Sequence, residues 1–152
     1  MKILDVLHKN TILPDLKSTD KKGVLEELVA PVSVVSGINS YEIMHVLMDR
    51  EQLGSTGIGQ GIGIPHGKLK NIESLVLGLG ISHKGVDFES IDDRPTYIFF
   101  LLITPEASTG LHLKVLARIS KILKNDLFKE QLLNAYDSEK IIEIIKEEDE
   151  EF

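Results

Sequence analysis

The amino-acid sequence predicts a single α/β domain, a three-layer α/β/α sandwich with a central mixed sheet. One observation is the segment 97–103, which is apolar throughout and therefore typical of a central strand covered on both faces. The other is that segments with a helical spacing of apolar residues occur both before and after it. A length of 152 residues, 42% of them hydrophobic, is enough for one domain with a full core.

Two helices are expected before the sheet. Residues 18–20 provide capping oxygens for the first, which should end near Pro31 because proline disrupts a helix interior. The second should begin at Asn39, where Glu42 completes a capping box, and end around Gly54. The apolar stripes of the two helices contain Leu25, Leu28 and Val29, and Ile43, Val46 and Leu47.

The second half of the chain is expected to contain two strands and three helices. Segment 75–81 has apolar residues at every odd position and two glycines on the other face, so it is predicted to form a strand. The second predicted strand is segment 97–103. Helices are expected at about 111–124, 126–135 and 138–146, and His112 extends the apolar stripe of the first of these. The domain should span residues 1–147, and the acidic residues 148–152 should form a solvated, frayed tail.

Composition excludes several classes of function. A net charge of −7 and a pI of about 5.2 have the wrong sign for a nucleic-acid binder. Without cysteine the chain has no disulfide, iron–sulfur cluster or thiol nucleophile, which is compatible with a reducing cytoplasm. The N-terminus does not resemble a signal peptide, and no apolar segment approaches the roughly 20 residues of a membrane span. We therefore expect a cytoplasmic protein that neither binds nucleic acid nor inserts into a membrane.

The stretch GSTGIGQGIGIPHGK, residues 54–68, is unusually rich in glycine. A P-loop requires serine or threonine after Gly-Lys, but Leu69 follows Lys68. A dinucleotide fingerprint requires a different glycine spacing and a preceding strand, whereas a helix precedes this stretch. A protein-kinase loop requires far more chain than 152 residues. The glycines therefore need another explanation.

The residues favour an explanation in which the glycines give access to His66. Glycine at every second position would strip one face of an extended segment of its side chains and leave backbone N–H groups open to a ligand. Pro65 fixes its own backbone, restricts Ile64 and so aims the next side chain, His66. A neutral imidazole presented in this way is suited to attack a phosphoryl group and form a covalent intermediate. The alternative is that His66 is a turn residue and that the glycines serve a tight crossing of loops.

Two further side chains are candidates for the same site. His112 lies in the first turn of its helix, where free N–H groups favour an anion; the alternative is a core histidine bonded to a backbone carbonyl. Arg50 precedes the glycines by one turn and could clamp a phosphate, or it could form a surface pair with Asp49 or Glu51. A metal site is not expected, because the remaining histidines show no ligand spacing.

Two motifs carry a resemblance to a known family. Residues 50–66, REQLGSTGIGQGIGIPH, resemble the signature of the fructose/mannitol-type enzyme IIA domains of the bacterial sugar phosphotransferase system. Residues 111–117, LHLKVLA, resemble the second histidine motif of this family. The resemblance spans residues 3 to about 146. It implies that His66 is the phosphorylated histidine, His112 the auxiliary histidine and Arg50 the active-site arginine.

The resemblance also implies an activity, that of a phosphotransferase working through a phosphohistidine intermediate. A phosphorylated histidine-containing phosphocarrier protein would dock on the glycine-lined face, and His66 would attack its phosphoryl group in line. His112 and Arg50 would hold the phosphate through charge-assisted hydrogen bonds. No metal or organic cofactor is required. Further contacts to phosphate or partner are predicted from Ser55, Thr56, Gly57, Gly59, Gly61 and Gly63.

Two branches of this family remain open. PHGK at 65–68 and FESIDDRP at 88–95 resemble the nitrogen-regulatory branch, whose free-standing proteins act on a regulatory target protein. A sugar-specific IIA would instead pass its phosphate to an enzyme IIB domain for sugar uptake. A pure binding module would use the same surface without covalent chemistry. One departure from the family pattern is Gly63, where many relatives carry alanine.

Overall fold

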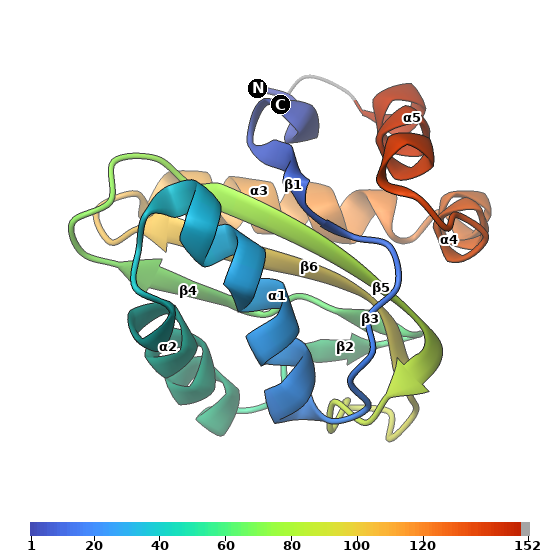
Figure 1. Cartoon of the computed structure of the whole chain (residues 1–152), viewed down its shortest axis with the longest axis horizontal. Helices are drawn as coiled ribbons and strands as arrows, with labels where there is room; N and C mark the ends of the chain where they lie inside the picture. Colours follow the sequence, from blue (N-terminus) through green and yellow to red (C-terminus); the bar gives the residue numbers. More distant parts are fainter. Residues whose placement is uncertain (150–152) are drawn as a thin grey trace.

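The computed structural model of the chain describes residues 1–149, in which helices cover both faces of a six-stranded sheet (Figure 1). Among these residues, no helix combines the length and the apolar character that crossing a bilayer requires. In chain order the elements are η1 (Ile3–Asp5), β1 (Leu7–Leu13), α1 (Lys21–Ser36), α2 (Ser40–Gln52), β2 (Gly57–Gly59), β3 (Ile62–Gly63), β4 (His66–Leu69), β5 (Val76–Val86), β6 (Thr96–Pro105), α3 (Thr109–Ile122), α4 (Asp126–Leu133) and α5 (Ser138–Glu148).

The sheet is mixed, as the sequence predicts. Its strands lie in the order β1-β5-β6-β3-β2, and β4 also pairs with β6. β5 and β6 are antiparallel, whereas β1 runs parallel to β5, and β3 and β4 run parallel to β6. Ile62 of β3 pairs with Ile98, and His66 of β4 pairs with Leu102, so β3 and β4 follow β6 in one register. His66 therefore lies on the continuation of β3 along the same edge of β6.

Strand β6 separates two apolar layers, which confirms the predicted sandwich. Its residues at 98–103 are each no more than 1% exposed, and alternate side chains point to opposite faces of the sheet. One set packs with α3, α4 and α5, and the other packs with α1 and α2, as the arrangement in Figure 1 shows. The first set is Ile98, Phe100 and Leu102, and the second is Phe99, Leu101 and Ile103.

The two glycines of β5 allow α1 to approach the sheet closely. A Cβ atom on Gly80 would lie 2.7 Å from Cδ2 of Leu28, and one on Gly78 would lie 3.1 Å from Cγ2 of Val32. The opposite face of β5 carries Leu77, Leu79 and Ile81, which are fully buried in the other layer. The alternation in the sequence therefore gives β5 two different faces. Apolar side chains pack in the core on one face, and on the other the glycines let α1 lie close to the backbone of the strand.

The first helix does not end near Pro31, which corrects the sequence prediction. α1 continues through Pro31 to Ser36 and stops at Gly37, whose φ of 73° supplies a left-handed cap. Proline removes one hydrogen bond inside a helix, at a cost of about 3 kcal/mol. Val32 in the following turn is fully buried against the sheet, and apolar burial of this kind offsets that cost.

Strand β1 has no counterpart among the predicted elements. His8, Lys9 and Asn10 are exposed in succession, so the segment lacks the alternation that marks a half-buried strand. Its pairing with β5 also shifts in register between Leu7 and Ile12. An irregular edge strand of this kind leaves a weak pattern in a sequence.

Helices α2 to α5 and strands β5 and β6 agree with the predicted elements in type and differ at their ends, whereas η1, β2, β3 and β4 were not among the predicted elements. Asn39 caps α2 as predicted, because its side chain accepts the N–H of Tyr41. β5 continues to Val86, beyond the predicted segment. α5 runs to Glu148, and the N–H of Leu4 donates to the carboxylate of Asp149. Of the predicted tail, Glu148 is thus helical and Asp149 is hydrogen-bonded to Leu4, and residues 150–152 lie outside the described residues.

Candidate active site

The three side chains that the sequence singles out, Arg50, His66 and His112, line one pocket of about 470 Å³. The end of α2, the strand β4 and the first turns of α3 meet there. Leu53 and Leu113, which are 84% and 61% exposed, also line it. A larger hollow of about 780 Å³ lies between α1 and α2, away from these side chains. The smaller pocket is the candidate active site because it joins two imidazoles and a guanidinium.

The ring of His66 is fixed by a hydrogen bond to the backbone two residues before it. Its Nδ1 lies 2.7 Å from the carbonyl oxygen of Ile64. Because a carbonyl oxygen only accepts, Nδ1 carries the proton and Nε2 is left with a free lone pair. The backbone that carries the ring is held as well, since the carbonyl of Pro65 accepts the N–H of Leu102 at 2.9 Å. The structure thus presents Nε2 as the nucleophilic atom.

His112 lies beside His66 and is buried. The centroids of the two rings are 5.2 Å apart, and their planes meet at 62°. His112 is 5% exposed, and its Nδ1 lies 2.6 Å from the hydroxyl oxygen of Thr104, which is fully buried in β6. The sequence alternative, a core histidine bonded to a backbone carbonyl, is therefore not what the structure shows. His112 is bonded to a side chain and faces the pocket of His66.

Both imidazoles have a lowered pKa. Burial is the main cause for His66, and the positive charge of Arg50 acts in the same direction, while the bond to Ile64 opposes them. For His112, burial is the main cause, and the charge of Lys68 and the charge that His66 gains on protonation act in the same direction, so the pKa is lowered to about 4. At neutral pH both rings are therefore uncharged, so the lone pair on Nε2 of His66 is available to attack an electrophile.

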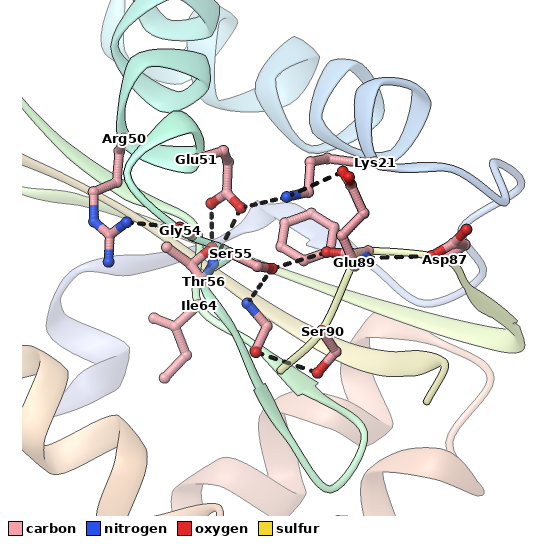
Figure 2. Close-up of polar contacts among 12 residues, drawn as sticks. Lys21, Arg50, Glu51, Gly54, Ser55, Thr56, Ile64, Asp87, Glu89 and Ser90 are labelled. Carbon is pink, nitrogen blue, oxygen red and sulfur yellow. Dashed lines mark hydrogen bonds and ion pairs between the residues drawn. The ribbon is translucent and has the colours of Figure 1, made fainter. Parts of the chain in front are cut away.

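Arg50 lies in the last turn of α2 at the rim of the pocket. Its Nη1 donates to the carbonyl of Gly54 at 2.9 Å, just beyond the end of the helix (Figure 2). The two acidic neighbours that the sequence offers as surface partners pair elsewhere. Glu51 contacts Lys21 at 3.0 Å, and Asp49 lies 3.3 Å from Nε2 of His45. The guanidinium is thus anchored by one nitrogen, and Arg50 is among the residues that line the pocket.

A second cation, Lys68, also lines this pocket. Its Nζ lies 3.1 Å from the hydroxyl of Thr109 in the first turn of α3. Lysine and arginine donors in the same pocket as the imidazoles suit a phosphate group. Within residues 1–149, no group of three or more histidine, aspartate or glutamate side chains is placed to hold a metal ion.

Within the glycine-rich stretch, Gly57, Gly59, Gly61 and Gly63 belong to a hairpin and are not among the residues that line the pocket of His66, whereas Gly67 is. β2 and β3 form the hairpin, and the turn between them has positive φ values at Gly59, Gln60 and Gly61. A Cβ atom on Gly63 would lie 3.1 Å from the ring of Phe99, and one on Gly57 would lie 3.0 Å from the backbone of residue 90. These glycines therefore have tasks in a turn and in close packing.

Ser55 and Thr56 are also directed away from His66. The hydroxyl of Ser55 donates to the carbonyl of Phe88 at 2.9 Å, and the hydroxyl of Thr56 donates to the carboxylate of Glu51 (Figure 2). Thr56 is 2% exposed. A role in phosphate or partner binding for these two residues and for Gly57, Gly59, Gly61 and Gly63 stays a prediction, and their geometry gives them structural tasks.

Two partners of the histidines escaped the sequence patterns. One is the carbonyl of Ile64, which any residue could supply and which no side-chain pattern can indicate. The other is Thr104, for which there was a signal, namely a hydroxyl at the end of a strand that is otherwise apolar. A buried hydroxyl requires a hydrogen-bond partner, and His112 is the residue that meets this requirement.

Comparisons with known proteins show the family and the fold of this chain. The family described as phosphoenolpyruvate-dependent sugar phosphotransferase system, EIIA 2, matches residues 5–148. A nitrogen regulatory protein of Bradyrhizobium diazoefficiens is 37% identical over 145 residues, which are 95% of this chain and 95% of that protein. The fructose-specific EIIABC component of Bacillus subtilis is 35% identical over 150 residues, which are 98% of this chain and 24% of that protein.

Solved structures show the same architecture. The crystal structure of nitrogen regulatory protein IIA-Ntr from Neisseria meningitidis has a TM-score of 0.87 at 29% identity, covering 93% of this chain and 97% of that one. The mannitol IIA of Escherichia coli, at 19% identity, shares the fold with a TM-score of 0.77 over 91% of this chain and 97% of that one. The chain therefore belongs to the EIIA type 2 family of the phosphoenolpyruvate-dependent sugar phosphotransferase system, whose domains are phosphoryl carriers.

Proposed function

We propose that this protein accepts a phosphoryl group on Nε2 of His66 and carries it as a nitrogen-type regulatory IIA. The observation that carries the proposal is the 2.7 Å bond from Nδ1 of His66 to the carbonyl of Ile64. This bond leaves Nε2 unprotonated in a ring whose centroid is 5.2 Å from that of His112. Two cations, Arg50 and Lys68, line the same pocket and suit an incoming phosphoryl group.

The donor in this proposal is a histidine-containing phosphocarrier protein that bears a phosphohistidine. The lone pair on Nε2 of His66 attacks the phosphorus atom in line, and a new N–P bond forms as the donor's N–P bond breaks. The donor nitrogen recovers the electron pair of the broken bond. Because Nδ1 of His66 keeps its proton throughout, the transfer needs neither a general acid nor a general base.

His112 and Arg50 would stabilise the phosphoryl group after transfer. The group adds roughly −1.5 to −2 charge to the pocket, as other phosphorylated side chains do. The pKa of His112 is low because of burial and nearby positive charge, so a nearby dianion acts against the second cause and raises it. The imidazole can then donate a charge-assisted hydrogen bond to the phosphate. Arg50, which lines the same pocket, can add further donors.

The regulatory branch is favoured by relatives that match this chain along nearly their whole length. The Bradyrhizobium diazoefficiens protein, named a nitrogen regulatory protein, is such a relative. A second candidate function is a sugar-specific IIA that passes its phosphate to an enzyme IIB domain. The 35% identity to the fructose-specific component of Bacillus subtilis favours it. Both candidate functions imply a cytoplasmic protein.

The proposal is tested by incubating the protein with phosphoenolpyruvate and the general phosphotransferase components, followed by mass spectrometry at alkaline pH. We expect one phosphoryl group, located on the peptide that contains His66. The labelled protein is then offered to fructose- and mannitol-type IIB domains. Retention of the label supports the regulatory branch, and rapid loss to a IIB domain supports the sugar-specific one. An unlabelled protein would overturn the proposal in favour of a pure binding module.

A further inference from the structure

Glu51 is a buried acidic residue at the end of α2 that the chemistry of the pocket does not use. It is 7% exposed, and a carboxylate in such a place is costly unless its charge and its lone pairs are satisfied. Nζ of Lys21 lies 3.0 Å from one of its oxygens. The backbone N–H of Thr56 donates to the same oxygen at 3.1 Å, and the hydroxyl of Thr56 donates to the other. Figure 2 shows the carboxylate held between α1 and the segment that follows α2.

The residue that Glu51 holds is linked by hydrogen bonds to His66. The carbonyl of Thr56 accepts the N–H of Ile64 at 3.0 Å. The carbonyl of Ile64 accepts Nδ1–H of His66 at 2.7 Å. In an extended chain, the N–H and C=O of one residue point to the same side, so Ile64 directs both groups away from β6. One of these groups is placed by Thr56, and the other places the imidazole.

The segment around Thr56 needs such an anchor. It leads into the glycine hairpin, whose residues have few side chains to restrict the backbone. A carboxylate that takes both the N–H and the hydroxyl of Thr56 fixes this residue at two points. The tautomer of His66, in turn, depends on the position of one carbonyl, because a displaced carbonyl would no longer bind the proton on Nδ1.

We propose that Glu51 is a positioning residue for His66. Through Thr56 and Ile64 it holds the carbonyl that keeps the proton on Nδ1 and the lone pair on Nε2. This inference rests on the proposed function, in which Nε2 is the nucleophile. A merely structural role for Glu51 would be to join α1 to α2 through Lys21, and it predicts a loss of stability without a change in the imidazole.

The experiment compares two variants that weaken the contact between Glu51 and Thr56 with one conservative variant and one control. Glu51→Gln removes the charge and one acceptor, and Thr56→Val removes the hydroxyl but keeps the N–H that binds Glu51. Thr56→Ser restores the hydroxyl and should rescue the defect. The control is Glu89→Gln, which changes the exposed partner of Lys21 at 3.4 Å and leaves the Glu51–Thr56 contact intact.

The first measurement is the tautomer of His66 from long-range ¹H–¹⁵N NMR, recorded above pH 7 where an ordinary imidazole is neutral. We expect the Nδ1–H form in the wild type and in Glu89→Gln, and a mixture of both forms in Glu51→Gln and Thr56→Val. The second measurement is phosphorylation by the phosphocarrier. In Glu51→Gln and Thr56→Val we expect the maximal rate to fall on the order of 10-fold. Removing the residue that orients a metal-binding histidine typically costs about 10- to 100-fold in affinity or activity, and the expected effect takes the lower end of that range. The half-saturating donor concentration should not change, because Glu51 does not line the pocket.

The tautomer measurement does not depend on phosphorylation, so the two proposals can fail separately. A wild type that takes no phosphate would overturn the proposed function, while its NMR spectrum would still test the role of Glu51. An unchanged Nδ1–H tautomer in Thr56→Val would overturn the positioning role, even if Glu51→Gln fails to fold. A mixed tautomer in Glu89→Gln would also overturn it, because the effect would then come from the Lys21 cluster as a whole.

Discussion

Gly67 of β4 lies directly beneath Val46 of α2. A Cβ atom built on Gly67 would be 2.2 Å from Cγ1 of Val46, far inside contact distance. The absence of a side chain at Gly67 therefore lets α2 pack on the strand that carries His66. Arg50 lies one turn further along α2, so the same contact sets how near its guanidinium comes to the imidazole.

The first prediction follows from this contact. Gly67→Ala should push α2 away from β4 and lower the free energy of unfolding by about 1–3 kcal/mol, as overpacking does. Denaturant unfolding measures this. The control is Gly110→Ala on α3, where a Cβ atom meets nothing within 4 Å and the change should be neutral or slightly stabilising. A Gly67→Ala protein as stable as the wild type would contradict the close packing of α2.

The second prediction concerns the phosphoacceptor. His66→Ala should abolish acid-labile, base-stable phosphorylation. The other imidazole that lines the pocket, His112, is buried, and its Nδ1 is bonded to the hydroxyl of Thr104 rather than to a backbone carbonyl. The fold should persist, since the ring of His66 is only partly buried; circular dichroism and a thermal melt check this. Phosphate retained on the variant at wild-type levels would remove His66 from its assigned role.

The third prediction concerns His112. His112→Ala should accept phosphate slowly and pass it on poorly, because the missing ring would stabilise the phosphoryl group rather than form the bond. The variant also leaves the buried hydroxyl of Thr104 without its partner, at a cost of about 1–3 kcal/mol. His112→Gln offers an amide to the same hydroxyl and separates the two effects. Wild-type transfer in a stable His112→Gln protein would show that His112 serves only the core.

The fourth prediction distinguishes a phosphate clamp from a helix cap at Arg50. Arg50→Ala should slow phosphoryl transfer strongly and reduce stability by about 0.5–1.5 kcal/mol, the usual worth of the one hydrogen bond to Gly54. Arg50→Lys should restore transfer only in part, because lysine lacks the planar fork of donors. Transfer rates from the phosphocarrier are compared with melts of both variants. Rates near that of the wild type in both would place Arg50 outside the reaction.

The fifth prediction is a pH dependence of stability. The pKa of His112 is about 4 in the folded protein, below the ordinary value of 6.5, so the unfolded chain binds a proton first as the pH falls. The contribution of this group is complete above pH 6.5 and is lost as the pH falls toward 4, with a slope of at most about 1.4 kcal/mol per pH unit. His66 acts in the same direction.

The fifth prediction is measured by denaturant unfolding of the wild type and of His112→Gln across this pH range. The variant should show a shallower acid slope than the wild type. A direct check is the NMR titration of the imidazole protons, in which His112 should stay neutral until well below pH 6.5. A titration of His112 at the ordinary value would contradict the burial of a neutral ring.

The sequence was most informative where one side chain carries the function. The Pro-His-Gly context, the histidine on an apolar stripe and the arginine one turn before the glycines indicated three residues that the structure brings into one pocket. Helical and strand periodicity likewise placed β6 between two layers of helices. Such predictions succeed because a local pattern determines which face a side chain occupies.

The sequence was least informative where the partner is distant or is part of the backbone. The bond of Thr104 to His112 depends on how α3 packs on β6, and the path from Glu51 to Ile64 runs through backbone groups that no residue type marks. The glycine run was open to two interpretations, because a missing side chain permits both exposure and close packing. The packing task of Gly63 depends on its contact with Phe99, which is distant in the sequence.

Each of the two imidazoles is connected to one of two neighbouring strands, although His112 itself belongs to α3. His66 is part of β4, and His112 is tied through Thr104 to β6, which pairs with β4. Neighbouring strands in a sheet are held about 4.8 Å apart by their hydrogen bonds. These connections to the sheet therefore restrict changes in the distance between the two rings. Arg50 instead hangs from the tip of a helix, by one bond to a carbonyl beyond its end. A partner protein that contacts the end of α2 can therefore move the positive charge of Arg50 relative to His66 without moving His66 itself.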